Sequence, residues 1–355
     1  MAARDDLHEV LEVVRFQADG CARAGSPLYA TILDGVAADL RADGICAQLL
    51  SGRGSDPFGS ALALRLLGAV HRIVLEGRAP QLAAHYPSAG GDAERPGVAE
   101  AFLATLEAHR EELADRIDDG VQTNEVGRSA VLAGGYAEVA RSTGLPLRVL
   151  EMGASAGLNL RFDHYRYEID GRVSGDPDSP VRFAGMWQGP HRPDLPERFE
   201  VAERRGCDRN PIDATSDEGL TTLLAYTWPD QMDRIDRLRA AGRVAERVPV
   251  VVERANGPDW VAAALASPVE GVATVVTHTI VLQYLSASDR QRVRATIDTA
   301  GRSATAAAPL AWLRMEPAGD RAELRLTRWP GASDEVLATA GFHGRPIWWE
   351  PAHEA

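Results

Sequence analysis

An apolar strand that runs into a turn of very small residues constrains this chain most. The run Leu147–Leu150 leads into Glu151–Asn159, which reads Glu-Met-Gly-Ala-Ser-Ala-Gly-Leu-Asn. Small residues let a ligand approach the backbone closely, and the N–H groups at the start of a following helix point into the same space. The pattern predicts a strand, a ligand-binding turn and a helix of an α/β fold. A tight strand–helix connection without a ligand is the simpler alternative.

Beyond this turn, short apolar runs alternate with helical stretches. The predicted strands are the end of a strand at Arg205–Asp208, buried strands at Val248–Val252, Val272–Thr277 and Leu310–Met315, an edge strand at Ala322–Trp329 and a last strand at Ile347–Trp349. The predicted helical stretches are Leu220–Val244, Trp260–Leu265 and Asp289–Thr299. Such alternation predicts a mostly parallel sheet with helices on both faces.

The residues before the turn have a different character. Leu28, Ile32, Val36 and Leu40 recur at helical spacing, and no clear strand precedes residue 145. We therefore expect a helical N-terminal domain over residues 1–120 and a Rossmann-like α/β domain over residues 121–355. An insertion at about 161–197 interrupts the second domain, and its segments Tyr165–Ile169 and Val181–Phe183 are expected to pair as a hairpin.

Charge and composition exclude several classes of function. The net charge is −13 and no basic run offsets it, so a nucleic-acid backbone would be repelled over most of the surface. All 38 residues counted as lysine or arginine are arginine. A Schiff-base lysine for pyridoxal phosphate and a Walker-type phosphate lysine are therefore absent.

Three widely spaced cysteines, Cys21, Cys46 and Cys207, show neither a disulfide framework nor metal-ligand spacing. Their spacing fits a reducing compartment. No run approaches the roughly 18 apolar residues that a membrane span needs, and the polar N-terminus is unlike a signal peptide. We expect a cytoplasmic protein that takes a small-molecule substrate, with no metal, membrane or nucleic-acid partner. The oligomeric state is not predicted.

The turn resembles motif I of class I methyltransferases, which use S-adenosylmethionine (SAM). In that resemblance Glu151 faces the methionyl amino group, and the turn residues that line the cofactor are Gly153, Ala154, Ser155, Gly157 and Asn159. Asp208 would bind the ribose hydroxyls, and Asn256 or Asp259 the adenine. The resemblance implies methyl transfer to an O or N atom of a small molecule.

Four segments, one of them within the turn, are similar to the bacterial family called domain of unknown function 2332, and the similarity covers nearly the whole chain. They are Gln122–Ser129, Gly153–Asn159, Gly206–Asp213 and Trp228–Gln231. This similarity supports the fold and implies no particular reaction.

The turn also fits the Gly-x-Ser-x-Gly elbow of α/β-hydrolases, with Ser155 as nucleophile and Asp334 and His343 following in triad order. Helices rather than strands precede the turn, and Glu151 has no role in a hydrolase. A third alternative is a Rossmann-like protein that binds SAM or a nucleotide without catalysis.

Polar residues near the predicted strand ends complete the candidate site. His278 ends an apolar strand, where it is predicted to face the methyl group and accept a substrate proton. Tyr284 and Glu125 are further catalytic candidates. Asn124 and Arg128, which precede the helix before the first strand, are predicted to close over the cofactor. A buried structural histidine and a helix cap are the alternatives for His278 and for Asn124.

Overall fold

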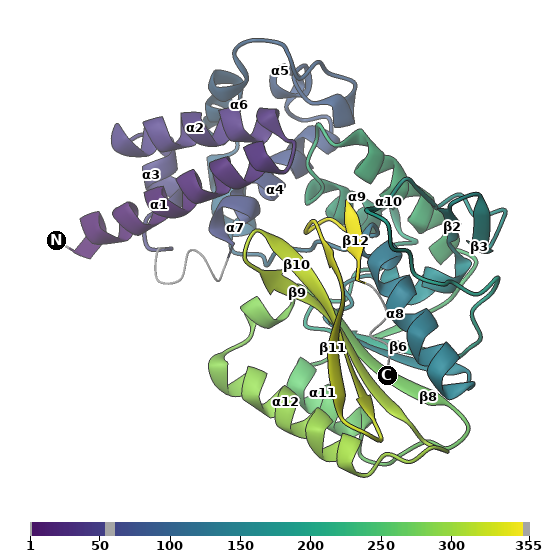
Figure 1. Ribbon diagram of the computed structural model, residues 1–355. Coiled ribbons are helices and arrows are strands. Elements are labelled where there is room, and N and C mark those ends of the chain that lie inside the picture. The colour runs from purple at the N-terminus through teal and green to yellow at the C-terminus, as the bar shows by residue number, and fades with distance from the viewer. Residues whose placement is uncertain (1, 54–60, 351–355) are drawn as a thin grey trace. The chain divides into compact units, whose positions relative to one another are not determined.

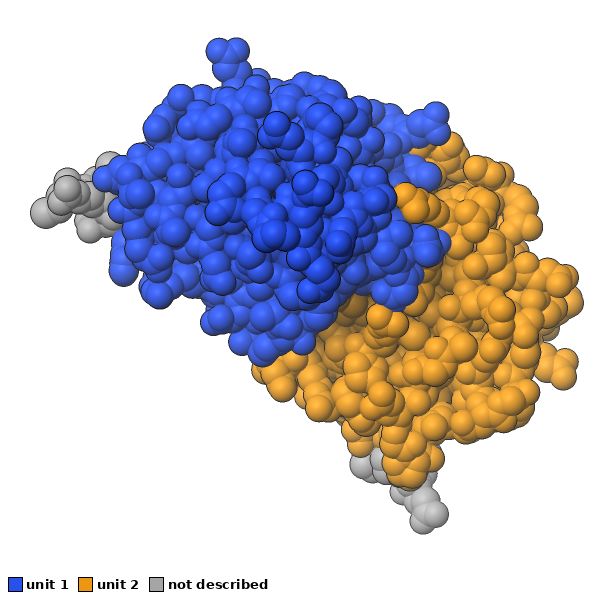
Figure 2. All heavy atoms as spheres, turned by 90° about the horizontal axis from the view of Figure 1, so that it is seen from above, with its two compact units in different colours: residues 1–123, 217–236 blue, residues 124–216, 237–355 orange. Residues whose placement is uncertain are grey.

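The structure, a computed structural model, describes residues 2–53 and 61–350, and the chain divides into two compact units (Figures 1 and 2). Unit 1 comprises residues 1–123 and 217–236, and unit 2 comprises residues 124–216 and 237–355. The segment 217–236 thus belongs to unit 1, although the sequence pattern assigned it to the second domain.

Within its described residues, unit 1 is built from helices. They are α1 (Ala2–Arg23), α2 (Pro27–Arg41), α3 (Ile45–Leu50), α4 (Leu62–Leu75), α5 (Pro80–Ala83), η1 (Pro87–Ala89), α6 (Val98–Ala108), α7 (Arg110–Arg116), α9 (Asp217–Ala225) and the start of α10 (Met232–Ala245). Leucine, isoleucine and valine side chains at helical spacing, such as Ile32 on α2 and Leu66 on α4, form one buried cluster.

A polar contact ties the distant segment 217–236 to unit 1. Asp230 lies in the turn between α9 and α10, which divides the single helical stretch predicted there. Its carboxylate accepts the Ser26 hydroxyl (2.7 Å) and the Leu28 N–H (3.2 Å). Because the first N–H groups of a helix have no partner within it, Asp230 acts as a second cap of α2.

Unit 2 is built around a nine-stranded sheet in the order β5-β12-β11-β10-β9-β8-β1-β6-β7. The strands are β1 (Leu147–Met152), β5 (Trp187–Gln188), β6 (Val201–Asp208), β7 (Val251–Arg254), β8 (Ala273–Thr279), β9 (Leu310–Ala318), β10 (Arg321–Trp329), β11 (Ser333–Ala340) and β12 (Ile347–Trp349). The five strands from β7 to β9 in that order are parallel, and β10, β11 and β12 follow as an antiparallel meander. The expected α/β class with a mostly parallel sheet is confirmed.

Helices cover both faces of this sheet (Figure 1). On one face α8 (Arg128–Thr143) packs on β8 to β11. On the other, α11 (Gly257–Ala264) and α12 (Ala287–Arg302) pack on β1, β6, β9 and β10 around a buried cluster that includes Leu150 and Trp312. Side chains alternate between the faces along each strand, so neighbours in the sequence point to opposite helical layers.

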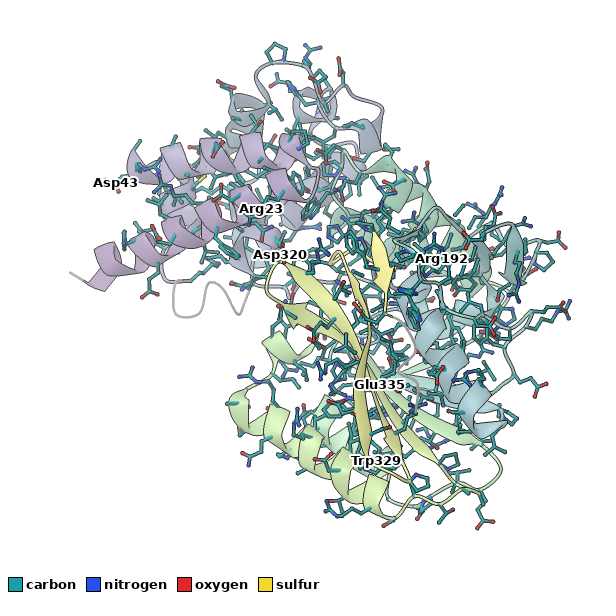
Figure 3. The ribbon with its side chains drawn as sticks, in the orientation of Figure 1. Arg23, Asp43, Arg192, Asp320, Trp329 and Glu335 are labelled. Carbon is teal, nitrogen blue, oxygen red and sulfur yellow. The ribbon has the colours of Figure 1, made fainter. Side chains whose placement is uncertain are left out.

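The prediction that residues 322–329 form an edge strand is wrong, because β10 lies between β9 and β11. Trp329, which ends β10 and is labelled in Figure 3, packs against the α-carbon of Gly301 on α12. On the side predicted to be exposed, β10 pairs with β11. The β11 sequence, Ser-Asp-Glu-Val-Leu-Ala-Thr-Ala, has few of the large apolar residues that mark a buried strand, so the sequence pattern did not indicate this strand.

The insertion forms a separate small sheet in the order β3-β2-β4. Its strands are β2 (Arg166–Ile169), β3 (Arg172–Gly175) and β4 (Arg182–Ala184). The predicted partners do pair, but β2 and β4 are parallel, and the hairpin is formed by β2 with β3. The tight turn at Asp170-Gly171, with both residues at positive φ, favours this nearer partner.

Among the described residues, no helix combines the length and apolar character required to cross a membrane.

Candidate functional site

The small-residue turn follows β1 and has three residues in the left-handed backbone region. Gly153, Ser155 and Gly157 have φ values of 73°, 51° and 67°. A Cβ atom on Gly153 would lie 2.6 Å from the Val281 side chain, so both the conformation and the space favour glycine there. The turn leads into a six-residue 3₁₀ helix, η2 (Asn159–His164), and not into the longer helix that the pattern suggests.

The N–H groups of the turn bond within the protein. Those of Gly153 and Ala154 donate to the Cys207 carbonyl at the end of β6 (2.9 and 3.0 Å), and Gly157 donates to the Ala154 carbonyl. The Ser155 N–H donates to Asp208 (2.9 Å). With these bonds made, the turn does not offer a cradle of free N–H groups for a phosphate.

Glu151, the last glutamate before the turn, has a buried carboxylate. Its side chain is 2% exposed, and its Oε2 atom is buried without a hydrogen-bond partner. The Asn159 side chain provides a hydrogen bond to the carboxylate. A buried carboxylate oxygen without a donor is costly, and a bound water, ion or ligand can satisfy such a group.

Burial and, to a smaller extent, the charge of Asp208 raise the pKa of Glu151 to about 8. Arg128, Arg161 and the Asn159 amide act in the opposite direction. The carboxyl group is therefore largely protonated at neutral pH unless a cation joins it. A ligand with a positively charged donor would satisfy the bare oxygen and favour the ionised form.

A short polar chain fixes Asn159. The Ser129 hydroxyl on α8 donates to Asn159 Oδ1 (2.7 Å). Because that oxygen is the acceptor, the Asn159 NH₂ group is the donor toward Glu151. Asn124 Oδ1 accepts the N–H groups of Ala156 and Leu158 (3.2 and 3.0 Å). The segment before α8 is thus bonded directly to the turn.

Glu125 lies just before α8, and Arg128 is its first residue. Glu125 is 5% exposed, and its Oε1 accepts the N–H of Gly127, the residue that precedes α8 (2.9 Å). The Arg128 guanidinium donates to the Phe342 carbonyl (3.0 Å) and to the Thr279 carbonyl at the end of β8 (3.2 Å). These bonds place the segment 124–128 over the carboxyl ends of β1 and β8.

Two further predicted cofactor residues lie at neighbouring strand ends. Asp208 ends β6, is partly exposed, and accepts the Ser155 and Asn210 N–H groups (both 2.9 Å). Asn256 follows β7 as the residue before α11 and donates to Asp259 (3.1 Å). Both Asn256 and Asp259 are exposed. Glu151, Asp208 and Asn256 therefore lie at the carboxyl ends of three adjacent parallel strands, β1, β6 and β7.

His278 lies elsewhere. Its ring is fully buried, Nδ1 lies 2.6 Å from Glu316 Oε1, and Nε2 accepts the Trp312 indole N–H (3.0 Å). Trp312 belongs to the cluster under α11 and α12, whereas Glu151 faces Asn159 and α8. The structure does not bring His278 together with Glu151. Tyr284, at the end of η3 (Leu282–Tyr284), is 40% exposed.

The residues of the hydrolase alternative are also apart. Across the sheet, Asp334 on β11 is in register with Thr327, Trp312, Val276 and Leu150 on the four successive strands β10, β9, β8 and β1. Four strand spacings therefore separate Asp334 from β1. At about 4.8 Å per strand, it lies roughly 19 Å from that strand. Its carboxylate binds Arg314 (2.8 Å) and Thr327 (2.7 Å). Ser155, Asp334 and His343 therefore do not form a triad here.

Arg161 was missed by the sequence analysis. It is 5% exposed and donates to the carbonyl groups of Val248 (2.8 Å), Ala156 (3.1 Å) and Gly157 (2.8 Å). It thereby ties the turn to the segment that enters β7. The sequence did offer a signal for this role. Arg161 stands only four residues after Gly157, in the largely apolar run that follows the turn, and an arginine buried there needs several hydrogen-bond acceptors.

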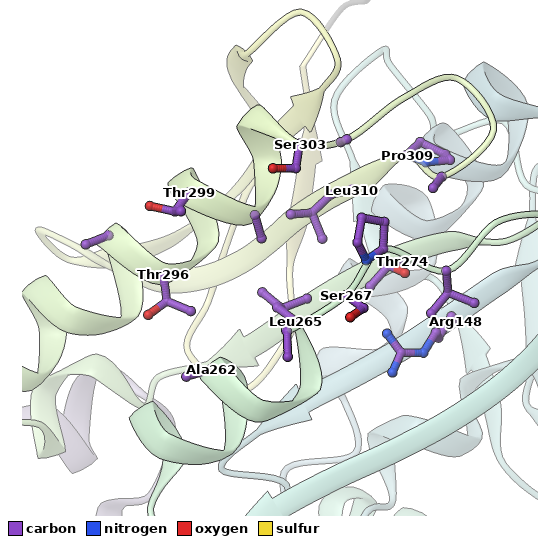
Figure 4. Close-up of a pocket in the computed structure, with 17 residues that line it drawn as sticks. Arg148, Ala262, Leu265, Ser267, Thr274, Thr296, Thr299, Ser303, Pro309 and Leu310 are labelled. Carbon is purple, nitrogen blue, oxygen red and sulfur yellow. The ribbon is translucent and has the colours of Figure 1, made fainter.

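A pocket of about 520 Å³ opens at the other end of the parallel strands, between α11 and α12 (Figure 4). It is lined mostly by small residues, with Arg148, Thr274 and Leu310 at the strand starts. The predicted site residues are not among its lining. Within residues 2–53 and 61–350, no three His, Cys, Asp or Glu side chains gather as a metal site.

Comparison with known proteins gives one family. Residues 12–349 match the model of a family described as "Uncharacterized protein conserved in bacteria (DUF2332)". No curated protein and no solved structure matches the chain.

Proposed function

The chain belongs to the bacterial family DUF2332, and we propose that it binds SAM beside Glu151 and transfers the methyl group to an O or N atom of a small molecule. The proposal rests on the chemistry of its own site, because the family description names no reaction.

The observation that carries the proposal is the bare carboxylate oxygen of Glu151. It is buried, lacks a hydrogen-bond donor and belongs to a group whose pKa is raised to about 8. The ammonium group of an amino acid supplies both a donor and a positive charge. SAM carries such a group, so the residues present fit this end of the cofactor.

The position of Glu151 in the sheet agrees with a cofactor site. From β1 the chain proceeds to β6 on one side and later to β8 on the other, so the strand order reverses at β1. Ligands of open parallel sheets bind beyond the carboxyl ends of the strands at such a point. The parallel order β7-β6-β1-β8-β9 supports a Rossmann-like, methyltransferase-type arrangement, whereas the meander from β10 to β12 is a feature of this chain.

The neighbouring strand ends offer partners for the rest of the cofactor. Asp208 retains acceptor capacity for ribose hydroxyls, because each carboxylate oxygen accepts more than the one backbone N–H bonded to it here. Asn256, exposed beyond β7, is the proposed partner of the adenine. The turn residues Gly153 to Gly157 provide a backbone surface against which the cofactor packs.

When bound, SAM supplies an electrophilic methyl group, and the protein must accept a proton from an O or N acceptor. Of the predicted catalytic residues, Glu125 belongs to the segment bonded to the turn, whereas His278 is buried on the other face. We therefore assign proton acceptance to Glu125, a role typically worth about 10²–10⁴-fold in rate. The net charge of −13 disfavours a nucleic-acid acceptor.

Calorimetric titration of SAM and of S-adenosylhomocysteine into the full chain tests the proposal. We expect saturable binding with a Kd well below 1 mM for both ligands, and an increase in Tm. The absence of both heat and a Tm shift at millimolar ligand would contradict it.

Binding without catalysis is the second candidate. The engagement of both nitrogens of His278 favours it, because this predicted base then has no nitrogen left to accept a substrate proton. Saturable SAM binding without methyl transfer to any of a broad panel of small hydroxyl and amine compounds would support this candidate.

A further inference from the structure

A chain of hydrogen bonds links a buried tryptophan to the loop after β8. The Trp312 indole N–H donates to His278 Nε2 (3.0 Å), and His278 Nδ1 meets Glu316 Oε1 at 2.6 Å. The same Glu316 oxygen accepts the Val281 N–H (3.1 Å), and the Leu282 N–H lies at 3.5 Å. Glu316 thus joins the β8 histidine to the backbone of the following loop.

The hydrogen-bond partners of His278 determine which of its ring nitrogens carries the proton. Since Nε2 accepts the indole N–H, its lone pair is in use and the ring proton is on Nδ1, which donates to Glu316. A proton on Nε2 would place two donors against each other. His278 therefore serves as a fixed donor, and its buried position leaves neither nitrogen for a substrate.

The loop held in this way lies against the candidate site. The Val281 side chain occupies the space beside the Gly153 α-carbon, where a Cβ atom would lie 2.6 Å away. Ile280 has a φ of 53°, a conformation that β-branched residues rarely adopt. Arg290 on α12 donates to the carbonyl groups of Leu282 (3.2 Å) and Leu285 (2.7 Å). Strained backbone of this kind persists when surrounding contacts hold it, often near functional sites.

We propose that His278 and Glu316 are positioning residues that hold the Ile280–Leu285 loop against Gly153 and so set the shape of the SAM site. The effect on SAM rests on the proposed function, whereas the effect on the loop does not. In this assignment His278 does not accept a proton from the substrate but affects the site by holding the loop.

Two pairs of variants separate positioning from general stability. Glu316→Ala removes the acceptor for the loop, whereas Glu316→Gln keeps an oxygen there. His278→Leu removes the donor, whereas His278→Asn retains an N–H group near the Nδ1 position. Glu335→Ala on β11 (labelled in Figure 3) is the control, because Glu335 is buried to a similar extent as Glu316 but bonds Arg328.

Hydrogen–deuterium exchange of the full chain reports on the loop without any ligand. For Glu316→Ala and His278→Leu we expect exchange about tenfold faster or more in residues 279–286 and faster exchange in residues 151–157. The Gln and Asn variants should restore most of the protection, and Glu335→Ala should leave both segments unchanged. Unchanged exchange in 279–286 for both Glu316→Ala and His278→Leu would overturn the proposal.

SAM calorimetry on the same variants tests the link to the site. We expect the Kd to rise about tenfold in Glu316→Ala and to stay within about twofold in Glu316→Gln and Glu335→Ala. An altered loop with an unchanged Kd would overturn the role at the SAM site. If the natural protein binds no SAM, the proposed function fails, while the exchange data still decide whether the pair positions the loop.

Discussion

Glu151 and His278 lie near the carboxyl ends of adjacent strands but point to opposite faces of the sheet. Glu151 on β1 lies beside Thr277 in the register, one residue before His278 on β8. Because side chains alternate along a strand, Thr277 shares the face of Glu151 and His278 takes the other. The hydrogen bonds agree with this assignment of faces, because Glu151 accepts a hydrogen bond from Asn159 and His278 accepts one from Trp312. The two residues therefore face different surroundings: Glu151 faces Asn159 and α8, whereas His278 faces Trp312 and Glu316.

Replacing Glu151 by glutamine is expected to stabilise the protein at alkaline pH. The pKa of the buried group is raised to about 8, so the folded state keeps a proton that the unfolded state releases at lower pH. Stability of the natural protein then falls as pH rises toward 8, by at most about 1.4 kcal/mol per pH unit. The stability of Glu151→Gln should not fall in this way, because the glutamine side chain has no proton to release.

Thermal unfolding at several pH values checks this prediction. The Tm of Glu151→Gln should exceed that of the natural protein at pH 8, and the difference should shrink toward pH 5. Glu270→Gln, which changes an exposed loop glutamate, should show no such trend. A lower Tm for Glu151→Gln at pH 8 would show that the carboxylate is satisfied within the protein.

Gly153→Ala should destabilise the protein more than Gly144→Ala. Both glycines have positive φ, at 73° and 66°, and alanine there costs about 1–2 kcal/mol. Only Gly153 has a close neighbour, Val281, whereas the space around Gly144 is open. The clash should add about 1 kcal/mol or more. Denaturant unfolding measures both costs, and Val281→Ala should restore part of the stability of Gly153→Ala. Equal costs at the two glycines would exclude a tight loop–turn contact.

Much of unit 2 was accessible from the sequence, because buried parallel strands such as β8 and β9 begin with short, mainly apolar runs. The glycine-rich turn and Glu151 could also be recognised, because they directly follow such an apolar run. The faces of Glu151 and His278 were not, since they depend on the register between β1 and β8, which no local pattern encodes. The contact of Asp230 with Ser26 joins residues about 200 positions apart, so the place of segment 217–236 was equally hidden.

Asp208→Asn should weaken SAM binding about tenfold and destabilise the fold by about 1 kcal/mol. Its carboxylate accepts the Ser155 and Asn210 N–H groups, and bonds to a charged acceptor are stronger than bonds to an amide. Calorimetry and denaturant unfolding measure the two effects. Asp213→Asn, which affects an exposed carboxylate bonded to Thr215, is the control. A stability loss without any change in Kd would restrict Asp208 to holding the turn.

Ser155 is not expected to react with a fluorophosphonate probe. Its predicted triad partner Asp334 lies four strands from β1 and binds Arg314 and Thr327. Intact-mass analysis after exposure to the probe should show the unmodified chain. Stoichiometric labelling that Ser155→Ala abolishes would revive the hydrolase alternative.

Proton release on binding SAM measures most directly whether Glu151 pairs with the ligand's ammonium group. Because its pKa is raised to about 8, Glu151 is mainly protonated at pH 7 and must ionise when the cation binds. Calorimetry in buffers of different ionisation enthalpy should show nearly one proton released by the natural protein, with a strongly weakened or absent signal for Glu151→Gln. Binding without proton release, or equal affinity of the two proteins, would contradict the role of Glu151.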